Sequence, residues 1–176
     1  LEPVAMDEGD ARLLNDLVEA AASQAARALV DMRMAEGQRL ALVLRKDLQY
    51  LTDSLDWVTE LARNLPEEYR ERLEARIAEL VGDMPVDPNR LAAEAAILAD
   101  RANIDEELVR LRSHLAEFSL ALEGDEPVGR KLDFLIQEMN REVNTIGSKS
   151  SNVAISQWVV EGKSVIEKLR EQVKNV

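Results

Sequence analysis

The stretch "KLDFLIQEMNREVNTIGSKS", residues 131–150, decides the fold class because its apolar residues recur every three or four positions. The shared face of the predicted helix carries Leu132, Leu135, Ile136, Met139, Val143 and Ile146. At about 100° per residue this spacing predicts an amphipathic α-helix, and Gly147 is its expected end. No part of the chain shows the alternation that is typical of a strand. The sequence therefore predicts an all-α protein.

The two flanks of this predicted helix are unusually polar. One flank carries Asp133, Gln137, Asn140 and Asn144, and the other carries Lys131, Glu138 and Glu142. Buried hydrogen-bond networks between helices would explain such residues, because these networks fix helix register. A binding surface is the alternative explanation. Phe134 and Arg141 lie opposite the apolar face, where an aromatic ring needs either a second packing helix or a ligand to stack on.

Apolar seams with helical spacing continue along the rest of the chain. Residues 7–34 and 40–62 form two of them, and Gly37 between them is either an interruption or a position tolerated inside one longer helix. Asp87 suits the start of one later helix, and either Ser151 or Asn152 suits the start of the last helix. We expect long helices that pair antiparallel in a bundle with coiled-coil-like contacts.

The same pattern predicts two regions. Residues 1–86 are expected to form a helical hairpin or coiled-coil-like region, and residues 87–176 a C-terminal helical domain.

The composition limits the classes of protein to consider. The chain of 176 residues is 46% hydrophobic but only 3% aromatic, which favours packing of Leu, Ala and Val between helices. It contains no cysteine, so disulfides, thiolate nucleophiles and cysteine-bound metals are excluded. No signal peptide is visible, and no apolar run approaches the roughly 20 residues that span a bilayer. These features predict a cytoplasmic protein that does not enter membranes.

The charge is strongly acidic but unevenly placed. The net charge of −12 argues against binding to nucleic acid or to acidic membranes. Residues 1–126 carry a net −14, however, and residues 127–176 a net +2. A solvated acidic surface explains this distribution. The alternative is that a polyanion meets the C-terminal third.

Two small groups of residues are candidates for chemistry. Glu107, Arg110 and the only histidine, His114, recur at i, i+3 and i+7 along one helix edge. A carboxylate and a guanidinium near an imidazole can set its protonation state, although a structural hydrogen bond would also explain a lone histidine. Glu138 and Glu142, four residues apart, suit either a hard divalent cation or pairing with basic residues. The chain has no P-loop, dinucleotide fingerprint, HExxH motif or nucleophile elbow.

Several phrases together resemble the C-terminal portion of the YicC-like family of bacterial proteins. They are "DMRMAEGQRLALVLRKDL", "LAAEAAILADRANIDEELVRLRSHLAEF" and "GRKLDFLIQEMNREVNTIGSKS", followed by "VVEGKSVIEKLREQVKNV". The resemblance covers nearly the whole chain and is most specific over residues 90–176. It implies an endoribonuclease with divalent-metal dependence that forms homo-oligomers. It also implies that the family's N-terminal, strand-containing region is missing here.

The resemblance implies a role for each candidate residue in metal-assisted cleavage of RNA, with no DNA expected as a partner. Phosphates would be held by Arg110, Arg112, Arg130, Lys131, Arg141 and Lys149. Sugars or bases would be contacted by Gln137, Asn140 and Asn144. Glu138 and Glu142 would hold Mn²⁺ or Mg²⁺, and His114 and Glu107 would serve as acid–base catalysts.

Two other roles remain open for the chain. One is a non-enzymatic helical module that drives oligomerisation or regulates an RNA-decay partner. In an intermediate case, the helices bind RNA while the missing region cuts it.

Gly162 departs from the family pattern, in which a leucine is expected in the apolar seam of the last helix. It predicts either a close approach of a neighbouring backbone or a locally weak helix.

Overall fold

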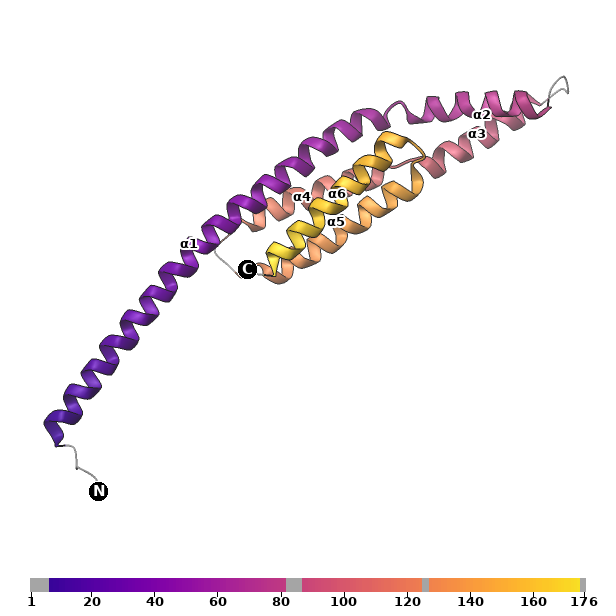
Figure 1. The fold of residues 1–176 in the computed structure, drawn as a ribbon. Coiled ribbons are helices and arrows are strands. Elements are labelled where there is room, and N and C mark those ends of the chain that lie inside the picture. Colours follow the sequence, from indigo (N-terminus) through magenta and orange to yellow (C-terminus); the bar gives the residue numbers. More distant parts are fainter. Residues whose placement is uncertain (1–6, 82–86, 125–126, 175–176) are drawn as a thin grey trace, which may run out of the picture. The chain divides into compact units, whose positions relative to one another are not determined.

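The computed structural model describes residues 7–81, 87–124 and 127–174, which are helical throughout apart from short connections (Figure 1). The helices are α1 (Glu8–Ala62), α2 (Leu65–Val81), α3 (Pro88–Ala102), α4 (Asp105–Ala121), α5 (Gly129–Lys149) and α6 (Val153–Val173). The described residues contain no strand, which confirms the all-α prediction. Among the described helices, none combines the length and apolarity needed to cross a membrane.

The chain divides into two compact units, residues 1–42 and residues 43–176. The predicted division after residue 86 stays a prediction. In the first unit, the described residues belong to α1, and Gly37 is tolerated inside this helix rather than interrupting it. The apolar side chains of this stretch, including Leu13, Leu17 and Leu29, are exposed.

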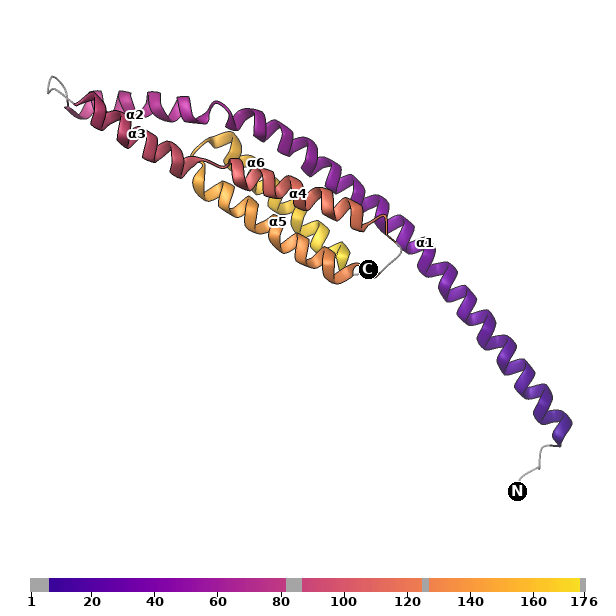
Figure 2. The same cartoon turned by 180° about the vertical axis from the view of Figure 1, so that it is seen from behind.

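The second unit contains the hydrophobic core. Helices α4, α5 and α6 lie side by side, as both views of the ribbon show (Figure 1, Figure 2). The last twenty residues of α1 contribute Leu44, Leu48, Leu51, Leu55 and Val58, which are all buried. Their alternating three- and four-residue steps are the seam predicted over residues 40–62. The core is completed by large buried side chains such as Phe118 of α4, Met139 of α5 and Leu169 of α6.

Helices α5 and α6 are joined by a turn of three residues, so they run antiparallel. Of the two predicted starts of α6, Asn152 is the cap: its Oδ1 accepts hydrogen bonds from the backbone N–H groups of Ala154 at 2.9 Å and Ile155 at 3.3 Å. The predicted end of α5 at Gly147 is wrong, because the helix continues to Lys149. A Cβ atom at Gly147 would lie 3.0 Å from Cγ1 of Val159, so this glycine allows α6 to approach closely.

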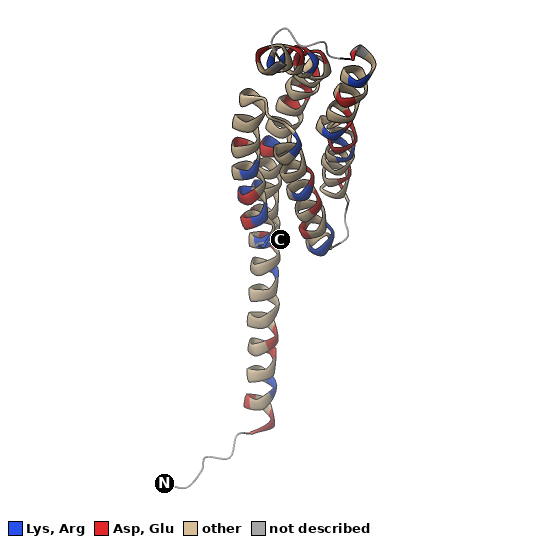
Figure 3. Cartoon of the chain, turned by 90° about the vertical axis from the view of Figure 1, so that its right-hand side faces the viewer, with Lys and Arg blue, Asp and Glu red and all other residues tan. Residues whose placement is uncertain are grey.

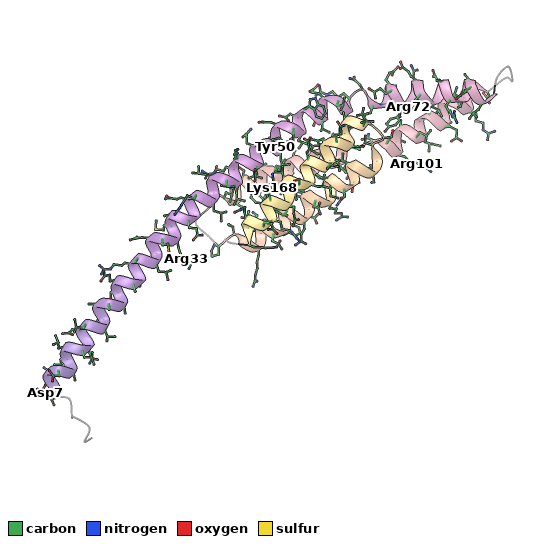
Figure 4. The ribbon with its side chains drawn as sticks, viewed as in Figure 1. Asp7, Arg33, Tyr50, Arg72, Arg101 and Lys168 are labelled. Carbon is green, nitrogen blue, oxygen red and sulfur yellow. The ribbon has the colours of Figure 1, made fainter. Side chains whose placement is uncertain are left out.

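The α5–α6 turn is also held by α2. Arg72 of α2 (Figure 4) donates from Nη1 to the Ser151 hydroxyl at 3.3 Å, and the Ser151 N–H donates to the Tyr69 hydroxyl at 2.9 Å. Farther along α6, Glu161 accepts a hydrogen bond at 3.1 Å from the hydroxyl of Tyr50 of α1 (Tyr50 is labelled in Figure 4). These bonds hold the α5–α6 turn to α2 and the middle of α6 to α1.

At Gly162 the predicted close approach of a neighbouring backbone is wrong, and the predicted local weakness of the helix stays a prediction. A Cβ atom there would lie 4.0 Å from the Trp158 ring and from Cδ2 of Leu51, which is an ordinary contact distance. Among the described residues, no neighbouring backbone lies closer to this Cβ position than these side-chain atoms do. Gly162 is buried, so the position belongs to the core.

Candidate metal centre

Two polar stripes meet where α4 and α5 pack against each other. The stripe on α4 consists of Glu107, Arg110, His114 and Glu117, and the stripe on α5 consists of Lys131, Glu138, Glu142 and Lys149. Steps of three, four or seven residues keep each stripe on one edge of its helix. We call these eight residues the polar seam. Ion pairs cross it at Glu107–Lys149 (2.7 Å) and Lys131–Glu117 (3.1 Å).

The centre of the polar seam carries a possible metal-binding triad. His114, Glu138 and Glu142 each offer one ligand atom, and these atoms all lie within 4.8 Å of one another. His114 and Glu138 are half-buried and Glu142 is buried. Ligand atoms around one ion lie roughly 3–4 Å apart when the bonds are about 2.1 Å long, so small side-chain rotations suffice to close the site. One imidazole nitrogen with two carboxylates suits Mn²⁺, Fe²⁺ or Zn²⁺ better than an all-oxygen site would.

Glu142 is a buried carboxylate whose cationic neighbour lies outside hydrogen-bond distance. Its residue exposure is 3%, and burial of a charged carboxylate is unfavourable unless a cation or hydrogen-bond donors compensate. The ion pair that it makes is with Nη1 of Arg110, at 3.9 Å from Oε1, which is beyond hydrogen-bond distance. The chemistry of the three side chains and the incomplete neutralisation of Glu142 therefore fit a divalent cation.

Arg110 lies at the edge of the triad and contacts a second carboxylate. Its Nη2 donates to Oε1 of Glu106 in the first turn of α4, while its Nη1 faces Glu142. The Arg110 side chain is 50% exposed and the Glu106 side chain 68% exposed. The guanidinium is thus held beside the triad with part of its surface open to solvent.

Glu107 lies farther along the polar seam. It precedes His114 by seven residues, roughly 10 Å along the helix axis. Its Oε1 accepts a hydrogen bond from Nζ of Lys149 at 2.7 Å, while Oε2 is buried without a hydrogen-bond partner among the described residues. The structure brings Glu107 to the same seam as His114 but pairs it with Lys149. Its acid–base role stays a prediction.

The residues predicted to contact RNA fall into three groups. Arg110, Lys131 and Lys149 belong to the polar seam. Arg112 lies on another edge of α4, where it pairs with Asp56 of α1 at 2.5 Å. The exposed surface of α5 carries Arg130, Gln137, Asn140, Arg141 and Asn144.

That exposed surface of α5 is only loosely paired. Gln137 donates to Asp133 at 2.8 Å, and Arg141 lies 3.8 Å from Glu138 with a side chain that is 71% exposed. Phe134 is exposed as well. Among the described residues, no second helix packs on its ring, which was one of the two explanations for an aromatic residue on this side of the helix. Figure 3 shows Lys and Arg residues interleaved with Asp and Glu along the bundle helices. Binding to RNA would therefore depend on particular cationic side chains rather than on a broad basic face.

Sequence reasoning missed Glu117, which extends the α4 stripe and pairs with Lys131. The signal was present in the spacing, since Glu117 follows His114 by three residues and continues the i, i+3, i+7 pattern to i+10. The partner of Glu117 was not predictable, because it depends on the register between α4 and α5.

Comparisons with known proteins agree with the sequence resemblance. The family model described as "Endoribonuclease YicC-like, C-terminal" matches residues 58–176. A Clostridioides difficile (strain 630) protein named "Probable endoribonuclease YicC" is 45% identical over 172 residues, which are 96% of this chain and 58% of that protein. A Haemophilus influenzae (strain ATCC 51907 / DSM 11121 / KW20 / Rd) protein of the same name is 38% identical over 147 residues, covering 84% of this chain and 50% of that protein. The chain thus spans little more than half the length of these curated relatives.

Proposed function

The chain belongs to the YicC-like family, and we propose that it carries the metal centre of an endoribonuclease that cleaves RNA. The observation that supports this proposal most directly is the triad of His114, Glu138 and Glu142, whose ligand atoms lie within 4.8 Å of one another. The two relatives are named as probable endoribonucleases, which supports RNA as the substrate. The proposal places the protein in the bacterial cytoplasm.

Each member of the triad has a distinct task. Glu138 and Glu142 hold the cation, Mn²⁺ or Mg²⁺, and neutralise it, and His114 supplies a ring nitrogen as the third ligand from the facing helix. When bound, such a cation supplies Lewis acidity for a phosphoryl oxygen and lowers the pKa of water. Because the ligands come from both α4 and α5, the packing of these helices sets the geometry of the site. If His114 is an acid–base catalyst instead, its removal will lower the rate without lowering the affinity for metal.

Cationic residues of the polar seam extend the site on both sides of the triad. Lys149 and Lys131 lie toward opposite ends of the α5 stripe, and Arg110 lies beside Glu142. Contacts between such residues and phosphates release counterions, so RNA binding is expected to weaken steeply with salt. The exposed amides of Gln137, Asn140 and Asn144 lie on the other flank of α5 and supply hydrogen bonds for sugars or bases.

A second candidate function is a non-enzymatic module for self-association. The exposed leucines of residues 8–42 favour it, because a row of apolar side chains on one helix is typical of a surface that another chain covers. Both functions are compatible in a homo-oligomeric nuclease. Sedimentation at micromolar concentration tests the association separately from the chemistry.

The decisive experiment combines metal binding with RNA cleavage. Isothermal titration with Mn²⁺ should show one site in the chain, and Glu142→Gln should weaken its affinity at least about tenfold. Asp133→Asn on the exposed flank of α5 is the matched control and should leave the affinity unchanged. Cleavage of a labelled RNA should require Mn²⁺ or Mg²⁺, with the full-length Clostridioides difficile relative assayed in parallel as the reference. Metal binding that survives Glu138→Gln combined with Glu142→Gln would refute the site.

A further inference from the structure

Arg110 has two carboxylate neighbours, one in direct contact and one farther away. Its guanidinium donates to Glu106, an exposed residue. Its Nη1 lies 3.9 Å from Oε1 of Glu142, the buried member of the triad. A buried carboxylate gains most from a cation in direct hydrogen-bonded contact. Arg110 is anchored by Glu106 and only partly neutralises Glu142.

The positive charge of Arg110 becomes unfavourable once a divalent cation binds to the triad. A guanidinium within a few ångströms of Glu142 would then face a doubly charged ion held by the same carboxylate, and like charges at such distances repel each other. Arg110 therefore opposes metal binding. The contact to Glu106 supports the helix, but it leaves the donors that face Glu142 free for another anion once the cation is bound.

A phosphodiester is a partner with the right chemistry. The guanidinium has five N–H donors in a planar fork that matches two oxygens of a phosphate, and the contact to Glu106 occupies one edge of it. The side chain is 50% exposed, so a phosphate can reach the remaining donors. The anchor at Glu106 keeps these donors beside the triad.

We propose that Arg110 exchanges partners during the reaction cycle. It neutralises Glu142 while the triad is free of metal, and it turns to a phosphate of the RNA when a cation has taken over that carboxylate. This role rests on the proposed metal centre. It makes Arg110 a substrate-orienting residue and favours an order of binding in which the cation enters before the RNA.

The exchange predicts effects of opposite sign from one substitution. In Arg110→Ala the Mn²⁺ affinity should rise about three- to tenfold, because a repelling charge is removed. The value of kcat/KM for RNA at saturating Mn²⁺ should fall about 10- to 100-fold, because a charge-assisted contact to phosphate is lost. Arg110→Lys keeps the charge but not the fork, so its Mn²⁺ affinity should match that of the wild type while its cleavage remains impaired.

The matched control is Arg112→Ala. Arg112 lies on the same helix with the same charge and a similar side-chain exposure of 47%, but it pairs with Asp56 of α1. Its substitution should leave the Mn²⁺ affinity within about twofold of the wild type. Circular dichroism melts of all variants show whether any of them loses the fold, and Arg110→Lys keeps the test valid if Arg110→Ala does.

The outcomes separate this inference from the proposed function. An unchanged or weaker Mn²⁺ affinity in Arg110→Ala overturns the exchange, even when Glu142→Gln abolishes binding and the metal centre itself stands. Tighter Mn²⁺ binding with unimpaired cleavage also overturns it, since Arg110 would then have no role toward the phosphate. A wild-type chain that binds no Mn²⁺ refutes both the metal centre and the exchange.

Discussion

The two parts of α1 have similar apolar spacing but opposite environments. Leu13, Leu17 and Leu29 are 60%, 59% and 52% exposed, whereas Leu51 and Leu55 are 2% and 0% exposed. Both groups lie in one uninterrupted helix, Glu8–Ala62. Apolar periodicity therefore identifies the face of a helix that seeks a partner. It does not indicate whether that partner belongs to the same chain.

The two parts of the helix also differ in what stabilises them. Residues 43–62 gain free energy from burial in the core of the second unit. Residues 8–42 depend on the intrinsic helix propensity of an Ala- and Leu-rich sequence, together with local side-chain contacts. A second copy of the chain would change this balance by covering the exposed leucines, and self-association through them stays a prediction.

The largest expected effect comes from truncating one leucine in each part. Leu55→Ala should reduce the free energy of unfolding by about 2–5 kcal/mol, because a fully buried side chain is lost and a cavity remains. Leu17→Ala should change it by less than about 0.5 kcal/mol in the dilute monomer. Chemical denaturation at several protein concentrations measures both. A concentration-dependent loss of stability in Leu17→Ala would show that a second chain covers this part.

Substituting alanine for a glycine should have opposite effects on stability in the buried and the exposed parts of the chain. Gly147→Ala places a Cβ atom 3.0 Å from Val159, and the resulting strain should exceed the gain in helix propensity by about 1 kcal/mol. At Gly37 a Cβ atom meets nothing within 4 Å, so Gly37→Ala should stabilise the helix by about 0.5–1 kcal/mol. Melting temperatures that move in the same direction for both variants would contradict the close approach of α6 at Gly147.

The smallest effect reports on the contact between α1 and α6. The hydrogen bond to Glu161, assisted by burial and by the negative charge of that carboxylate, raises the pKa of Tyr50 above its ordinary value of 10.0. Because the neutral phenol is favoured in the folded chain, this contribution to stability is present below pH 10.0 and is lost as the pH rises through the raised pKa. Ultraviolet titration of the phenol should show that Glu161→Gln moves the pKa back toward its ordinary value. An unchanged pKa would mean that the carboxylate does not contact Tyr50 in solution.

The candidate site was predictable in its parts. The spacing of Glu107, Arg110 and His114 placed them on one helix edge, and the spacing of Glu138 and Glu142 placed them on one flank, as the structure has them. The pairing of these two edges was not predictable, because the spacing along one helix does not determine its register against another helix.

The sequence by itself determined the helices, their apolar faces and most of their starts, because these depend on interactions between residues a few positions apart. Only the tertiary structure decided that His114 of α4 meets Glu138 and Glu142 of α5, since that contact follows from how the buried side chains of the two helices interlock. It also decided that α5 passes through Gly147, where a Cβ atom would come within 3.0 Å of the Val159 side chain. Contacts between residues distant in sequence are set by the packing of the whole core, so local spacing does not determine them.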